Sequence, residues 1–223
     1  MLGRDARAGV GRAFSPLART LVRLHITPDA ITWVGTILTC GLAVALLVPG
    51  HFVLGALLIT VVVLADSLDG LVARLTGTSS PWGAFLDSTL DRIADGVVLG
   101  ALAVHFLAVA PRSGLTIACG VLALAALVLG GAVSYAKARA ESLSMSADVG
   151  LMERADRFVV ILVGTLVTGL VGPWAMLVAM AVLVAGSAWT VAQRMGAVHR
   201  QGRRVPAAGE RPAVDTDPEG ARA

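Results

Sequence analysis

The stretch DSLDGLVARLTGTSSPWGAFLDSTLD, residues 66–91, places four carboxylates in an otherwise apolar part of the chain. Asp66 and Asp69 close one hydrophobic segment, and Asp87 and Asp91 open the next. A charge inside a membrane span costs about 2.5 to 3.5 kcal/mol on insertion scales, so four carboxylates together need a cationic partner. The stretch therefore predicts a cation site shared by two neighbouring helices.

The composition predicts an integral membrane protein. Of 223 residues, 56% are hydrophobic and 15% are charged, and the mean hydropathy is +0.80. Soluble domains usually carry about 25% charged residues. Apolar runs near the length of about 20 residues that crosses a bilayer predict an all-α fold with six transmembrane helices. These runs cover residues 30–49, 52–75, 83–109, 114–140, 156–171 and 173–195.

The distribution of positive charge predicts the orientation, because short cytoplasmic loops are enriched in Lys and Arg. The two termini and the loops near residues 76–82 and 141–155 carry nearly all the basic residues close to a span, whereas the opposite loops hold only Arg112. We expect both termini, and the carboxylate cluster with them, on the cytoplasmic side. The 17 Arg against one Lys suggest a GC-rich bacterial genome, hence a bacterial plasma membrane.

The two ends differ from the predicted membrane domain, residues 26–200. Residues 1–25 lack the apolar core of a signal peptide. Their apolar and arginine residues fall on opposite faces of a helical wheel, which predicts an amphipathic helix in the membrane interface, or alternatively one packed on the bundle. Residues 201–223 have almost no large apolar side chains, which predicts a disordered cytoplasmic tail.

Helix geometry predicts that the four carboxylates converge. Asp66 and Asp69 lie about 60° apart on one helix, and Asp87 and Asp91 lie about 40° apart on the next. The turn near residues 76–82 makes these helices antiparallel neighbours. Oxygen ligands favour hard cations, and Mg²⁺ typically binds a few carboxylates together with water and substrate phosphates. The charge suits two ions better than one.

Gly70, Arg74 and Gly83 lie within the same stretch. The glycines leave room for a bulky ligand beside the carboxylates, although close helix packing explains single glycines equally well. Arg74 suits a diphosphate, although a basic residue at a cytoplasmic helix end is also common. Together with the carboxylate spacing, these residues favour a binding site.

The pattern D-x2-D-G-x2-A-R-x8-G-x3-D-x3-D resembles, at all eight positions, the signature of the CDP-alcohol phosphotransferase family. The resemblance implies a membrane enzyme with six spans that moves a phosphatidyl or related group from a CDP-linked donor to an alcohol. It implies that two divalent metals, Mg²⁺ or Mn²⁺, bind Asp66, Asp69, Asp87 and Asp91, and that Asp91 is also the general base. The stretch TPDAIT, residues 27–32, resembles the start of the family's first span. Residues implied to contact the donor are Asp29, Thr32, Gly70, Arg74 and Ser80.

A second group of cations suggests an acceptor with its own phosphate. The stretches SYAKARAE, residues 134–141, and ERADR, residues 153–157, resemble those of the actinobacterial phosphatidylinositol phosphate synthases, a branch of this family. The resemblance implies CDP-diacylglycerol and inositol 1-phosphate as substrates, membrane lipid as surroundings, a homodimer and no nucleic-acid partner. The implied acceptor-phosphate residues are Lys137, Arg139, Arg154 and Arg194. Each alone is equally an ordinary basic residue at a cytoplasmic helix end.

Two other functions fit parts of the pattern. A phosphatidylglycerol phosphate synthase shares the aspartate signature and takes glycerol 3-phosphate, but the fourth span has KARAE where an R-[DE]-I-I-like stretch is expected. A divalent-cation transporter would hold its carboxylates near mid-membrane, whereas these lie near a helix end beside Arg74, which would repel the ion. Asp95, one turn after Asp91, fits either support of the metal ligands or a hydrogen bond to a neighbouring helix.

Overall fold

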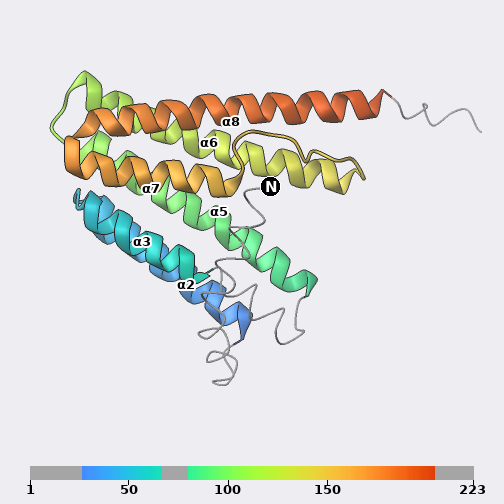
Figure 1. Ribbon diagram of the computed structural model, residues 1–223, viewed down its shortest axis with the longest axis horizontal. Coiled ribbons are helices and arrows are strands. Elements are labelled where there is room, and N and C mark those ends of the chain that lie inside the picture. The colour runs from blue at the N-terminus through green and yellow to red at the C-terminus, as the bar shows by residue number, and fades with distance from the viewer. Residues whose placement is uncertain (1–26, 67–79, 204–223) are drawn as a thin grey trace, which may run out of the picture.

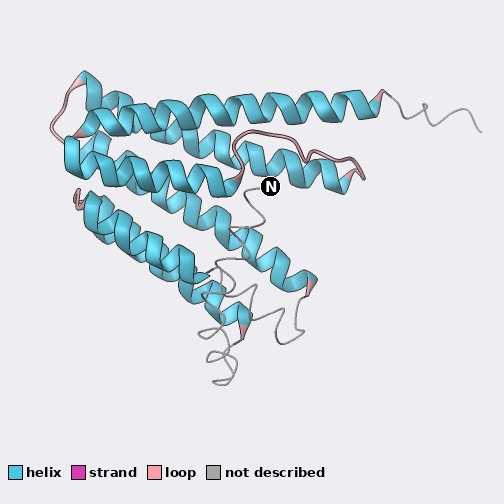
Figure 2. Cartoon of the chain, in the orientation of Figure 1, coloured by secondary structure: helices cyan, strands magenta, loops and turns pink. Residues whose placement is uncertain are grey.

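The computed structural model describes residues 27–66 and 80–203 of the chain. Within these residues it contains helices and connecting loops and no strand (Figure 2). The helices, in chain order, are α2 (Pro28–Leu42), η1 (Ala43–Leu47), α3 (Phe52–Asp66), α5 (Pro81–Val104), η2 (His105–Val109), α6 (Gly114–Ser142), α7 (Arg154–Val171) and α8 (Pro173–Gly202). Both η segments are π-helical turns that continue the helix before them.

Every predicted apolar run overlaps one of these helices, although several helices extend beyond the run. Four are long and apolar enough to cross a membrane, namely Pro28–Leu47, Pro81–Val109, Gly114–Ser142 and Pro173–Gly202. The helix α3 is a shorter apolar helix, and residues 67–75 of the predicted run lie outside the described residues. The predicted amphipathic helix also lies outside them. The predicted tail begins at residue 201, within two residues of the end of α8 at Gly202, and most of it lies outside the described residues.

Apolar side chains cover the outside of the bundle as well as its inside. Val128, Leu170 and Val178 are 70%, 69% and 61% exposed, respectively. In water, such a surface would be costly at about 25 cal/mol per Å², whereas lipid solvates it. The interior holds a continuous cluster from all the helices, including the fully buried Leu102 and Met180. The chain is therefore a membrane-embedded protein.

The helices α2 and α5 each begin at a capping residue that the sequence encodes. Thr27 precedes Pro28 of α2 and accepts a hydrogen bond from the Ala30 amide. Ser80 precedes Pro81 of α5, and its hydroxyl accepts from the Gly83 amide. Proline suits the first helical turn because its missing N–H is not needed there. These caps fix where α2 and α5 start.

The last two helices are separated by a single glycine. Gly172 has a φ of 100°, and Pro173 starts α8 immediately after it. At the other end of α7, Glu153 and Asp156 form a reciprocal capping box. In Figure 1, the start of α5 and the ends of α6 and α8 lie toward the same end of the bundle. The candidate site residues gather at this end.

Candidate active site at one end of the bundle

Three of the four predicted metal ligands lie together. One carboxylate oxygen from each of Asp66, Asp87 and Asp91 lies within 4.8 Å of the other two. Asp66 is the last residue of α3, and the other two lie one turn apart near the start of α5. The end of α3 meets the start of α5 here, so residues 21 and 25 positions apart form one cluster. Along their described length the two helices are not the packed neighbours that the sequence predicted, because each packs on α2 instead. The signature residues Asp69, Gly70, Ala73 and Arg74 lie outside the described residues.

The cluster has the chemistry of a divalent-cation site. Its donors are all carboxylate oxygens, which are hard ligands of the kind that Mg²⁺ and Mn²⁺ take. Carboxylates this close repel one another unless a cation lies between them. Asp91 is 8% exposed, so water screens its charge poorly. The residues present therefore fit a divalent metal.

Gly35 of α2 positions Asp66, a role that no pattern in the sequence indicated. A Cβ placed on Gly35 would lie 2.5 Å from Asp66 Oδ1 and 3.2 Å from its Cγ. Such distances are below van der Waals contact, so only glycine lets α2 approach the carboxylate. The glycine is far from the signature in the sequence, and its importance arises from helix packing alone.

Gly35→Ala should weaken metal binding, because the new methyl group displaces the Asp66 carboxylate. We expect the dissociation constant for Mn²⁺ to rise by about tenfold or more, as when a metal site loses its supporting contacts. Calorimetric titration of the purified protein in detergent measures it. Gly41→Ala, on the same helix, is the matched control, since a Cβ there meets nothing within 4 Å. An unchanged dissociation constant in Gly35→Ala would contradict the assignment.

The predicted donor-binding residues gather where α2 and α5 begin. Asp29 Oδ2 accepts a hydrogen bond from Trp82 Nε1 at 3.1 Å. The Thr32 hydroxyl donates to the Pro28 carbonyl. Ser80 caps α5, so its hydroxyl oxygen already serves the helix. Of these contacts, the hydrogen bond between Asp29 and Trp82 joins the two helix starts.

Next to the cluster is a cavity of about 370 Å³ whose lining is rich in cations. Three of the four predicted acceptor residues, Lys137, Arg154 and Arg194, line it. Arg139 does not line it and instead donates to the Ser142 hydroxyl at 3.3 Å. The structure thus brings together residues from α6, α7 and α8 that are far apart in the sequence.

Arg194 is a buried cation held by carbonyl groups. It is 4% exposed, and it donates from Nε to the Val149 carbonyl at 3.0 Å and from Nη1 to the Val133 carbonyl at 2.6 Å. Across residues 27–66 and 80–203, no carboxylate forms an ion pair with it. A buried charge is costly without an opposite charge. Arg194 therefore gives the cavity an unneutralised positive charge.

The other two cations are paired with acids. Lys137 Nζ lies 2.6 Å from Asp148 Oδ1, and its hydrogen bond holds the pKa of that carboxyl below its usual range. Arg154 Nη2 lies 2.5 Å from Asp91 Oδ1. Arg154 therefore links the cation-lined cavity directly to the carboxylate cluster.

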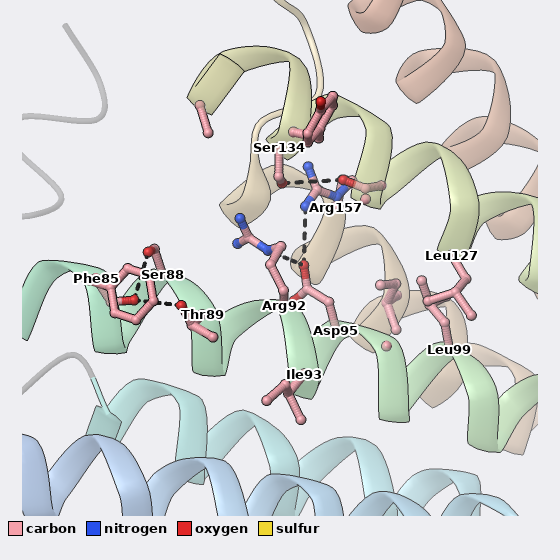
Figure 3. Close-up of a pocket in the computed structure, with 16 residues that line it drawn as sticks. Phe85, Ser88, Thr89, Arg92, Ile93, Asp95, Leu99, Leu127, Ser134 and Arg157 are labelled. Atoms are coloured by element: carbon pink, nitrogen blue, oxygen red, sulfur yellow. Dashed lines mark hydrogen bonds and ion pairs between the residues drawn. The ribbon is translucent and has the colours of Figure 1, made fainter. Parts of the chain in front are cut away.

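Three further charged residues lie beside the site, of which Arg92 was not predicted from the sequence. Arg157 was predicted only as part of ERADR, and of the two alternatives for Asp95 the structure shows the hydrogen bond to a neighbouring helix, from Arg157 Nη2 at 3.1 Å. Arg92 and Asp95 of α5 and Arg157 of α7 line a second cavity of about 560 Å³ between α5, α6 and α7 (Figure 3). Arg92 and Arg157 also line the smaller cavity. The four-residue spacing from Asp91 to Asp95 was the available signal. It could not show that the partner of Asp95 comes from α7.

Residues 25–205 match the CDP-alcohol phosphatidyltransferase family. The chain belongs to this family. Among its curated relatives is the phosphatidylinositol phosphate synthase of Cutibacterium acnes, which is 42% identical over 202 residues, or 87% of this chain and 96% of the relative. The chain is therefore a CDP-alcohol phosphotransferase, as the aspartate signature predicted.

Solved structures of the phosphatidylinositol phosphate synthase of Mycobacterium tuberculosis share the fold at 35% sequence identity. The structure with CDP-DAG bound has a TM-score of 0.79 and aligns over 91% of this chain and 100% of the other. The structure in complex with manganese and citrate has a TM-score of 0.78 over 89% and 92% of the two chains. The family is thus supported by sequence and fold together.

Proposed function

We propose that the protein transfers the phosphatidyl group from CDP-diacylglycerol to inositol 1-phosphate, giving phosphatidylinositol phosphate and CMP. The observation that carries the proposal is the cavity beside Asp91 that contains the buried, unneutralised Arg194. An acceptor that bears a phosphate supplies the missing negative charge next to the reacting centre. Relatives that bear this activity in their names, in Cutibacterium acnes and Mycobacterium tuberculosis, support the choice.

The donor is proposed to bind where α2 and α5 begin. Asp29 and Thr32 would contact the nucleotide there, together with Ser80, and Gly70 and Arg74 would complete the site from outside the described residues. Asp29 and Ser80 lie beside Gly83, since a Cβ there would lie 3.4 Å from Ser80 Oγ and 3.7 Å from Asp29 Oδ1. The diphosphate would then lie beside the carboxylate cluster.

Asp66, Asp69, Asp87 and Asp91 would hold two divalent ions, Mg²⁺ or Mn²⁺. Bound there, such ions neutralise charge on the diphosphate and on the departing CMP. The acceptor hydroxyl attacks the β-phosphorus, the phosphorus–oxygen bond to CMP breaks, and Asp91 takes the hydroxyl proton. Lys137, Arg154 and Arg194 would hold the acceptor phosphate so that its hydroxyl reaches that phosphorus. Arg139 is also proposed to bind this phosphate, and this assignment rests on the family resemblance alone.

We further propose that α3 and α7 complete six spans, preceded by an interfacial amphipathic helix. Both termini and the active site would face the cytoplasm of a bacterial cell, across its plasma membrane. The positive charges of α6, α7 and α8 lie at the end that this orientation places inside, as the positive-inside rule expects. The resemblance also implies a homodimer.

The decisive assay offers the purified protein CDP-diacylglycerol and Mg²⁺ or Mn²⁺ in detergent, with one candidate acceptor at a time. We expect CMP release with inositol 1-phosphate and little with free inositol, because free inositol leaves Arg194 without an anion. Glycerol 3-phosphate is the informative competitor. Release with glycerol 3-phosphate alone would assign the protein to phosphatidylglycerol phosphate synthesis, and release with free inositol alone would remove the role of the cation-lined cavity.

A further inference from the structure

Asp95 of α5 is surrounded by three guanidinium groups. Its Oδ2 lies 3.1 Å from Arg157 Nη2 and 3.9 Å from Arg92 Nε, and its Oδ1 lies 3.7 Å from Arg154 Nε. Figure 3 shows Arg92 and Arg157 converging on this carboxylate from two different helices. Asp91 belongs to the same network, since its Oδ2 lies 3.8 Å from Arg92 Nη2. Two carboxylates therefore lie among three positive charges that would otherwise repel one another.

The pair of Asp95 and Arg157 is the fixed part of this cluster. The Arg157 side chain is 4% exposed and that of Asp95 is 13% exposed. Gly130 of α6 packs against the guanidinium, since a Cβ there would lie 3.4 Å from Arg157 Nε, in van der Waals contact. A hydrogen-bonded ion pair buried between helices holds both side chains in place, because separating them leaves a buried charge alone.

Arg154 lies between two carboxylates with different roles. Its Nη2 contacts Asp91, the residue proposed to take the acceptor proton, while its Nε faces Asp95 at 3.7 Å. Arg154 Nε and Asp95 Oδ1 are both buried, and neither has a hydrogen-bond partner within the described residues. A shift of less than one ångström would join these two atoms, because a hydrogen bond of this kind is about 2.7 to 2.9 Å long.

We infer that Asp95 is a positioning residue that holds Arg154 at the acceptor cavity when Asp91 is engaged in the reaction. A carboxylate that takes a proton from the acceptor cannot also serve as the permanent counter-ion of Arg154. Asp95, held by Arg157, supplies a second counter-ion that the chemistry does not consume. Arg154 then keeps its orientation and presents its remaining N–H groups to the acceptor phosphate. This inference rests on the proposed function.

The test replaces Asp95 by Asn, which keeps the shape and removes the charge. We expect the KM for inositol 1-phosphate to rise about tenfold while the KM for CDP-diacylglycerol changes by less than about twofold. Asp156→Asn is the matched control, because Asp156 is an exposed acid on α7 that lines neither cavity. Equal changes in both KM values, or a lower melting temperature with neither KM changed, would overturn the inference.

A double-mutant cycle asks whether Asp95 acts through Arg154. In an Arg154→Ala background, Asp95→Asn should raise the acceptor KM by less than about twofold, since its target is already missing. If the two substitutions acted independently, their fold-changes in the acceptor KM would multiply, and that result would overturn the inference. Asp95→Glu and Arg157→Lys keep the charges and should stay closer to the wild type than Asp95→Asn. They provide the same comparison if Asp95→Asn fails to fold.

A binding measurement separates this inference from the proposed function. Titration of inositol 1-phosphate into the purified protein, without CDP-diacylglycerol, should show the same loss of about tenfold in Asp95→Asn. Wild-type protein that binds neither inositol 1-phosphate nor glycerol 3-phosphate would refute the proposed function and, with it, this inference. Wild-type binding that Asp95→Asn leaves unchanged would refute only the role of Asp95.

Discussion

Asp91→Asn should reduce kcat by about a thousandfold or more, within the range that general base catalysis supplies. Asparagine has the size of aspartate, so the packing of α5 around this buried position is kept. It cannot take the acceptor proton, and it is a weaker metal ligand. CMP release from CDP-diacylglycerol with inositol 1-phosphate measures the loss.

Raising the Mn²⁺ concentration separates the two roles of Asp91. If the residue acts only as a ligand, saturating Mn²⁺ should restore much of kcat, since weaker metal binding is overcome by mass action. We expect kcat to stay low at saturation. Asp156→Asn, which removes a carboxylate from the exposed start of α7, should keep full activity. Near-normal turnover by Asp91→Asn would remove Asp91 from the role of base.

Arg194→Ala should raise the KM for inositol 1-phosphate by about a hundredfold, because a hydrogen bond to a charged group contributes about 1.5 to 3 kcal/mol. The KM for CDP-diacylglycerol should change far less, since Arg194 lines the cavity that we propose for the acceptor. Initial rates at varied concentrations of each substrate give both values. Equal increases in the two KM values would contradict a separate phosphate site.

Two comparisons show whether the effect of Arg194 is specific. Arg200→Ala removes an exposed arginine from the same helix and should leave both KM values near those of the wild type. Arg194 also holds the carbonyl groups of Val149 and Val133, so Arg194→Ala is expected to lower the melting temperature. Arg194→Lys keeps the charge, and we expect an intermediate acceptor KM if the phosphate contact matters.

Much of the site was predictable because it is encoded locally. The spacing of Asp66, Asp87 and Asp91 predicted a cluster between two antiparallel helices, and three carboxylates do lie together. The helix period and the short connection between the helices are enough for that prediction. The family was equally predictable, since eight fixed positions in 26 residues carry it.

The acceptor side was predicted less completely. Lys137, Arg154 and Arg194 line one cavity, whereas Arg139, two residues after Lys137, does not. Basic residues near helix ends are common on the cytoplasmic side of membrane proteins. Sequence alone therefore cannot tell those that face a cavity from those that face outward, because the rotation of each helix about its axis depends on its neighbours.

The sequence by itself determined the membrane class, the approximate positions of the helices and which carboxylates share a helix face. Apolar length and helix period act within one segment, so these features need no information from other segments. Tertiary structure alone decided that Gly35 lies against Asp66, that Arg157 pairs with Asp95, and that Arg154 reaches Asp91. Each of these contacts joins different helices. They depend on the distance and rotation between packed helices, which no pattern within a single segment specifies.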